Sequence, residues 1–245
     1  MPLSLHRLII VAGLIAPGLA ADESVKAPDI TAEPLQIIRT MEVSFPAKLL
    51  QQNIDAGEAS IMVMVGADGQ LLDWLVTGFS HALFAMEVLE VLPKWKFIPA
   101  YHRGTAIPTR VELKFFFKNS AFIRILPSDT GLIARHKLDG SMGGFTSFVC
   151  LPDELDQPLD AKVEIAPMPP DQLGAKAKGG QVVVEYLVDT EGKVRMPIII
   201  SAEEEAFANS VLLAISQWRY EIPRHQGLPV ITRVRHQFTF TPVSR

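Results

Sequence analysis

The sequence predicts an α+β protein of two tandem domains, each a small antiparallel sheet packed by one helix. Three observations predict this fold: a long internal repeat, a recurring order of strand, turn, strand, helix and strand, and a length of 245 residues that suits about two domains. Hydrophobic residues make up 48% and charged residues 20% of the chain, so both domains have enough apolar material for a core.

The internal repeat has a constant offset of 123 residues. Its anchor pairs are Gly57 and Gly180, Gly69 and Gly192, Trp95 and Trp218, and Gly104 and Gly227. A period this long exceeds the roughly 20–50 residues of solenoid repeats, which indicates duplicated globular domains. We expect these domains at residues 28–118 and 152–242, joined by a connecting segment at 119–151.

The N-terminus, residues 1–20, has the pattern of a secretory signal peptide. Arg7 precedes an apolar run from Leu8 to Ala16, and Gly18 and Ala20 are the small residues of a cleavage site after Ala20. A membrane-spanning helix needs roughly 20 apolar residues, and this run is shorter. We therefore expect a periplasmic or secreted protein, with an uncleaved membrane anchor as the less favoured alternative.

Each domain begins its repeat with a predicted hairpin. Its strands are residues 59–65 and 70–77 in the first domain and residues 181–188 and 193–201 in the second. Gly69 and Gly192 end the turns, where glycine adopts positive φ without steric cost. We expect both glycines to have structural roles.

A helix with one apolar face follows each hairpin. The apolar residues recur at i, i+4, i+8 and i+11, as Phe84, Val88, Leu92 and Trp95 and again as Phe207, Val211, Ile215 and Trp218. Trp95 and Trp218 are therefore predicted to anchor the two cores rather than to stack on a ligand.

The last strand of each domain alternates strictly between two faces. Thr109, Val111, Leu113 and Phe115 are predicted to point inward, with Lys114 on the outward face. The second domain repeats the inward face as Thr232, Val234, His236 and Phe238. Of the connecting segment, residues 123–126 and 146–149 are possible strands, and we expect the segment to add an edge strand to one domain.

Residue patterns typical of catalysis or cofactor binding are missing from the sequence. The six histidines have no metal-ligand spacing, and the single cysteine, Cys150, excludes an internal disulfide and is expected to be a half-buried apolar residue. Asp129-Thr130-Gly131 occurs once, whereas aspartic proteases need two facing carboxylates. We therefore expect no enzyme, no metal and no cofactor. The net charge of −4 also disfavours nucleic acid as a partner.

These positions resemble the C-terminal domain of the TonB family, the periplasmic module of energy transducers for outer-membrane transport. The motifs of the first domain are Phe45-Pro46, Gly57, Asp68-Gly69, Trp95-Lys96-Phe97-Ile98-Pro99-Ala100 and Phe115. Those of the second are Gly180, Glu191-Gly192, Trp218-Arg219-Tyr220, Gly227-Leu228-Pro229-Val230 and Phe238. The second domain departs from the family pattern at Met168-Pro169-Pro170 and at Glu221-Ile222-Pro223.

The resemblance implies that the protein binds an extended segment of a protein or peptide partner, such as an outer-membrane receptor, by adding it as a strand to a sheet edge. The candidate edges comprise Thr109, Val111, Leu113, Lys114 and Phe115 and, in the second domain, Thr232, Val234, His236 and Phe238. The alternative is that these edges pair with each other, with the connecting segment or with a second copy, which would favour a self-associating assembly protein. No spanning anchor and no long Pro-rich spacer precede the first domain, so we expect no force transmission by this chain alone.

Overall fold

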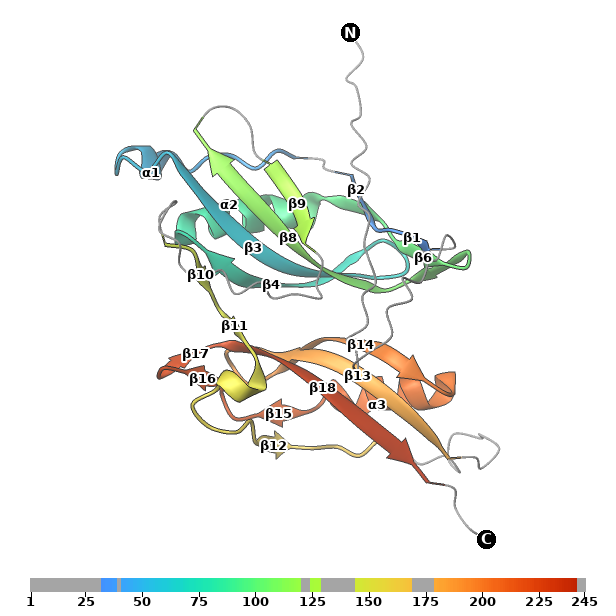
Figure 1. Cartoon of the computed structure of the whole chain (residues 1–245). Coiled ribbons are helices and arrows are strands. Elements are labelled where there is room, and N and C mark those ends of the chain that lie inside the picture. Colours follow the sequence, from blue (N-terminus) through green and yellow to red (C-terminus); the bar gives the residue numbers. More distant parts are fainter. Residues whose placement is uncertain (1–31, 39–40, 120–123, 129–143, 169–178, 242–245) are drawn as a thin grey trace, which may run out of the picture. The chain divides into compact units, whose positions relative to one another are not determined.

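A five-stranded sheet and a four-stranded sheet form the centres of two separate units (Figure 1). The units comprise residues 1–147 and 148–245, and their boundary falls inside the predicted connecting segment. The structure, a computed structural model, describes residues 32–38, 41–119, 124–128, 144–168 and 179–241. The predicted signal peptide and Asp129-Thr130-Gly131 lie outside the described residues.

The sheet of the first unit is built around β3 (Ala56–Val65). This strand forms a hairpin with β4 (Leu71–Phe79), and after helix α2 (Ala82–Val91) the chain returns as β8 (Thr109–Lys118) along the other side of β3. Both pairings are antiparallel, and the complete strand order is β10-β4-β3-β8-β9.

The second unit repeats this path around β13 (Gly180–Val188). A hairpin leads to β14 (Val194–Ala202), helix α3 (Glu205–Ile215) follows, and β18 (Ile231–Phe240) returns beside β13. The strand order is β11-β18-β13-β14. In each unit the final strand thus pairs with the first strand of the hairpin, in a register that is unbroken along its length. The mixed helix and sheet fold is confirmed.

Shorter elements complete both units. In the first they are β1 (Ala32–Glu33), β2 (Gln36–Ile38), α1 (Ala47–Leu50), the 3₁₀ helix η1 (Leu92–Lys94), β5 (Lys96–Ile98), β6 (Ala100–His102), β7 (Thr105–Ile107), β9 (Arg124–Ser128) and β10 (Thr146–Ser147). In the second they are β11 (Val149–Cys150), the 3₁₀ helix η2 (Pro152–Glu154), β12 (Ala161–Val163), β15 (Arg219–Tyr220), β16 (Arg224–His225) and β17 (Leu228–Pro229).

The apolar residues at helical spacing are buried in the cores, but the α-helices end earlier than predicted, α2 at Val91 and α3 at Ile215, so both tryptophans lie beyond them. Phe84, Val88 and Leu92 are fully buried, as are Phe207, Val211 and Ile215 in the second unit. Trp95 is 5% exposed and Trp218 is 1% exposed. Each indole N–H donates to a backbone carbonyl of the segment before its hairpin: Trp95 to Met41 at 3.1 Å and Trp218 to Ile165 at 2.8 Å. Both tryptophans therefore fasten an irregular segment to the core, which the sequence pattern did not predict.

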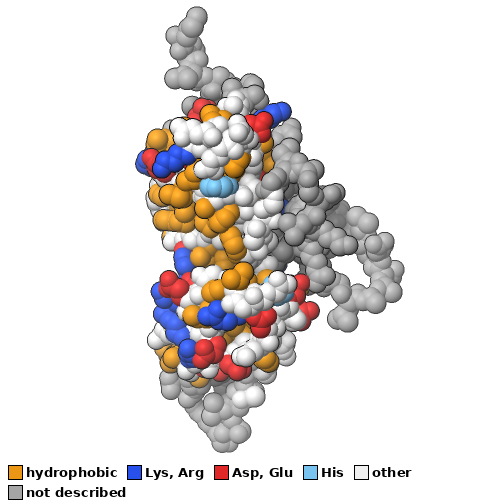
Figure 2. All heavy atoms as spheres, turned by 90° about the vertical axis from the view of Figure 1, so that its left-hand side faces the viewer, with side chains coloured by type: hydrophobic (Ala, Val, Ile, Leu, Met, Phe, Trp, Pro, Cys, Tyr) orange, Lys and Arg blue, Asp and Glu red, His pale blue; other side chains and the backbone are white. Residues whose placement is uncertain are grey.

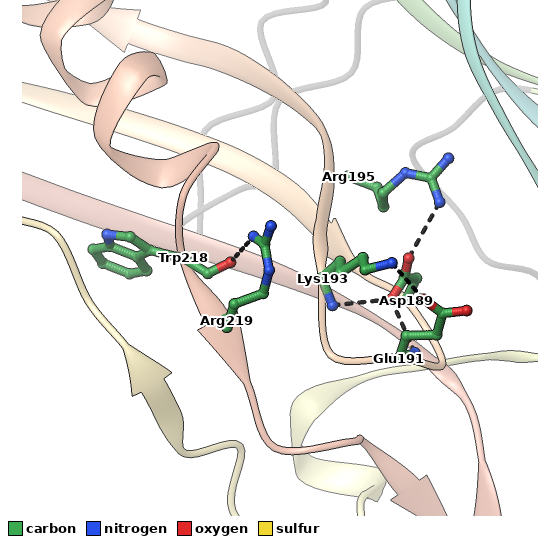
Figure 3. A network of polar contacts seen from close by, with 6 residues as sticks. All are labelled: Asp189, Glu191, Lys193, Arg195, Trp218 and Arg219. Atoms are coloured by element: carbon green, nitrogen blue, oxygen red, sulfur yellow. Dashed lines mark hydrogen bonds and ion pairs between the residues drawn. The ribbon is translucent and has the colours of Figure 1, made fainter.

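The hairpin turns have the same backbone conformation in both units. Gly69 and Gly192 each have φ +78°, a region that favours glycine. In the second turn the Asp189 carboxylate accepts hydrogen bonds at 2.9 Å from the backbone N–H groups of Glu191 and Lys193 (Figure 3). Arg195 also donates to it, at 3.1 Å. The Asp189 side chain therefore stabilises the turn through these hydrogen bonds.

In its described residues the connecting segment contributes three strands, more than the single edge strand expected. β9 lies beside β8 and β10 beside β4, so both sides of the first sheet are extended, while β11 joins β18 in the second unit. The β11–β18 pair is parallel, which corrects the prediction of purely antiparallel sheets. The reason lies in chain direction: β11 precedes the domain and runs alongside the start of its last strand, with no hairpin between them.

Candidate strand-addition site

β18 has one side that is only partly paired. Toward the sheet centre it pairs with β13 from Thr232 to Phe240. On its other side, β11 pairs only with Ile231 and Thr232. From Arg233 to Phe240, no strand within the described ranges lies along that side. This stretch of β18 is the candidate site for adding a strand.

The backbone of β18 presents every second amide to this side. The N–H of Ile231 donates to the carbonyl oxygen of Phe148 at 2.7 Å, on the β11 side. Because alternate residues of a strand direct their N–H and C=O groups to the same side, those of Arg233, Arg235, Gln237 and Thr239 face the same way. Four residues thus offer the donors and acceptors that an added strand would use.

Of the predicted site residues of the second unit, three lie within this stretch and one does not. Val234 and Phe238 pack against the core, and the His236 ring lies 5.4 Å from the Trp218 ring and 4.6 Å from the Phe238 ring. Thr232 is fully buried, and its hydroxyl donates to the carbonyl oxygen of Cys150 at 3.0 Å. Thr232 therefore pairs with β11 and lies outside the unpaired stretch.

On the opposite face of β18 lies a charged group that sequence reasoning missed. Glu185 of β13 lies opposite Arg235, and the distance from its carboxylate to the guanidinium is 3.1 Å. Arg233 lies 3.7 Å from the other carboxylate oxygen. The alternation along each strand placed these residues outward, but the cross-strand register that brings them together is visible only in the structure.

The equivalent edge in the first unit is occupied. Residues Glu112 to Phe116 of β8 pair antiparallel with Ser128 to Arg124 of β9. Of the predicted residues, Val111, Leu113 and Phe115 lie in the core, and Lys114 lies opposite Leu126. Over residues 112–116 this edge of β8 is therefore covered by a strand of the connecting segment, the arrangement that the sequence analysis gave as the alternative to an open edge.

β9 also resembles a sheet-terminating strand. The N–H of Asn119 donates to the carbonyl oxygen of Asp55, on the β3 side, so the amides of Glu112 and Lys114 face β9. Leu113, opposite Pro127, then lies at a position without ladder hydrogen bonds. Proline is tolerated where its missing N–H would face away from the sheet, and it discourages a further strand.

Cys150 is half-buried and has no sign of reactivity. Burial, and then the nearby carboxylates of Glu154 and Asp156, raise the pKa of its thiol. A raised pKa keeps the thiol protonated, whereas reactive cysteines need a stabilised thiolate. Within the described ranges, no three His, Cys, Asp or Glu side chains gather as a metal site would require.

Charges of both signs lie close together on the face shown in Figure 2, where blue and red side chains are interspersed over the described residues. Apolar side chains and a small area of histidine form the remaining coloured surface there. None of the helices in the described part of the chain is long and apolar enough to cross a membrane.

Part of the second unit matches a known protein family. Residues 169–242 match the family model described as Gram-negative bacterial TonB protein C-terminal. The match covers under a third of the chain and includes all of β13, β14, α3 and β18. The part of the chain with the partly unpaired final strand is thus similar to the C-terminal domain of TonB.

A solved structure shows a weaker likeness. The solution NMR structure of the Pseudomonas aeruginosa TonB C-terminal domain is 21% identical, covering 37% of this chain and 92% of that one, with a TM-score of 0.30. No curated protein matches the chain.

Proposed function

We propose that this chain is an exported, non-enzymatic protein-binding protein of the cell envelope, linked to outer-membrane transport. Its second unit captures an extended peptide of a partner protein as an added strand on β18. The observation that carries this proposal is the stretch from Arg233 to Phe240, paired with β13 on one side and with no strand on the other in the described residues. The family match of residues 169–242 supports it, because that family supplies periplasmic protein-interaction modules.

The first unit is proposed to be a second domain of the same type, and the domains to span residues 28–118 and 152–242. The shared order of hairpin, helix and final strand supports this, as do the matching conformations of Gly69 and Gly192. Since β9 lies along the edge of β8, we place partner binding on the second unit and not on the first.

Gln237→Pro tests the proposal. Its side chain is exposed and its N–H faces the unpaired side, where a proline is compatible with an edge strand. We expect the full-length variant to stay folded and to lose detectable binding, because proline removes a donor and its ring occupies the place of the incoming strand. Affinity is measured by titration with peptides resynthesised from partners that the full chain captures from an envelope extract.

Gln237→Ala is the matched control, since it alters the side chain and keeps the backbone donor. It should bind as the parent does, and circular dichroism should show both variants folded. Unchanged affinity in a folded Gln237→Pro variant would rule out β18 as the site.

Self-association is the second candidate function, because the same stretch of β18 could pair with β18 of another copy. Sedimentation separates the two. A dimer that dissociates in the Gln237→Pro variant, without any peptide, favours assembly, whereas a monomeric parent that binds peptide favours capture.

A further inference from the structure

Two different surfaces flank the unpaired stretch of β18. Arg233, Arg235 and Gln237 lie on one face of the sheet, and Val234, His236 and Phe238 lie on the face that packs against the core of the second unit. Since the residues of an added strand also alternate between faces, each surface constrains every second residue of the partner.

The first surface carries more positive than negative charge. The Arg235 guanidinium lies 3.1 Å from Glu185, and Arg233 lies 3.7 Å from it, so two guanidiniums share a single carboxylate. The Arg235 side chain is 44% exposed and that of Glu185 only 9%. The accessible charge is therefore that of arginine, whose several donors suit a carboxylate.

The guanidinium of Arg233 has a hydrogen-bond donor that Glu185 does not satisfy. Its Nε is buried and makes no hydrogen bond within the described residues, because the nearest Glu185 oxygen, at 3.7 Å, is beyond hydrogen-bonding range. A further carboxylate arriving beside Arg235 would draw on the same pair of guanidiniums.

The second surface is aromatic and only half covered. His236 and Phe238 are both partly exposed, and both rings contact Trp218, at centroid distances of 5.4 and 5.7 Å. Apolar side chains on an added strand would extend this layer and remove apolar area from water.

At the start of β18 the two residues of β11 pair in the parallel orientation. The equivalent edge of the first unit is covered over five residues by β9. β9 runs antiparallel to residues 112–116 of β8, which the 123-residue offset relates to residues 235–239 of β18. Residues 235–239 lie within the stretch of β18 whose outer side is unpaired in the described chain. Directly opposite residues of an antiparallel pair share a face.

We infer that the partner of β18 is an extended peptide in which acidic and apolar residues alternate. It runs antiparallel to β18, with a carboxylate opposite Arg235 and apolar side chains opposite Val234 and His236. This inference rests on the function proposed above and adds the chemistry of the ligand to it.

Two fluorescein-labelled probes test the inference on the full chain. The acidic probe is Thr-Val-Thr-Val-Glu-Val-Glu, whose residues lie opposite Thr239 to Arg233 in this register, and the basic probe has lysine in place of each glutamate. We expect the acidic probe to bind about tenfold more tightly, with a preference that shrinks at high salt. Arg235→Glu should reverse the preference, and Arg235→Gln, which avoids a second carboxylate beside Glu185, should remove it.

Lys162→Glu is the control, since it changes the net charge as Arg235→Glu does but lies on β12, paired with Glu221 at 3.0 Å. It should leave the preference intact. If both probes bind the parent equally and neither binds Gln237→Pro, the inferred preference for acidic residues is wrong, but strand addition at β18 is supported. If Lys162→Glu changed the probe preference as much as Arg235→Glu does, the inferred preference for acidic residues would also be wrong. If neither probe bound the parent, both this inference and the proposed function would be contradicted.

Discussion

Trp218→Ala is expected to unfold the second unit at temperatures where the parent is folded. Truncating a buried tryptophan costs roughly 3–5 kcal/mol, a large part of the 5–15 kcal/mol that stabilises a domain. Trp218 is 1% exposed, packs on Tyr220, His236 and Phe238, and donates its indole N–H to Ile165. The substitution therefore removes a core ring and the anchor of a segment. Calorimetry of the full chain measures the effect.

Trp95→Ala should have the same effect on the first unit, because Trp95 is 5% exposed and its indole N–H anchors Met41. Trp74→Ala is the control for losing an indole, since Trp74 is 37% exposed, and its cost should be much smaller. A Trp218→Ala variant that melts within about 2 °C of the parent would contradict the core role, since 1 kcal/mol shifts a small domain by roughly 4–8 °C.

Gly192→Ala is expected to be the most destabilising change after the two tryptophan truncations. Gly192 has φ +78°, where a non-glycine residue costs about 1–2 kcal/mol. A Cβ there would also overlap the carbonyl oxygen of Tyr220, whose own N–H donates to the Gly192 carbonyl at 2.8 Å. Because this contact joins the backbone of the turn to the backbone of β15, neither segment can shift without breaking the hydrogen bond. Urea denaturation of the full chain gives the loss of stability.

Gly227→Ala separates the two causes. Gly227 has φ +76°, but a Cβ there would meet no atom within 4 Å, so this variant is subject only to the conformational cost. Gly192→Ala should lose clearly more stability than Gly227→Ala. In the first unit Gly69, where a Cβ would lie 2.6 Å from the Phe97 carbonyl oxygen, and Gly104, which has open space, form the same pair. Equal losses at Gly192 and Gly227 would contradict the close approach.

The sequence predicted the features that depend on side-chain periodicity. Trp218 and Phe207 stood at helical spacing and proved buried, and Phe115 stood in a strict alternation and proved to be core. The turns at Gly69 and Gly192 followed from the need for positive φ. These signals are local, so one chain was enough to detect them.

The sequence could not predict the pairing of sheet edges. Residues 123–126 were predicted as a possible strand, and nothing in so short a segment specifies which strand it joins, since ladder hydrogen bonds are made by the backbone of any residue. The same holds for β11, whose two residues cover Thr232. The sequence therefore indicated the final strand of each domain as a candidate edge. The structure was needed to distinguish the covered edge on β8 from the unpaired stretch of β18.

Residue-resolved amide hydrogen exchange on the full chain tests the central claim most directly. In the free protein the amides of Val234, His236 and Phe238, which face β13, should exchange slowly, and those of Arg235, Gln237 and Thr239 should exchange fast. Saturation with the acidic probe should slow the second set and leave Lys114 of β8 unchanged. Arg235, Gln237 and Thr239 amides that are already slow in the free protein, or that stay fast when the probe is bound, would contradict strand addition at β18.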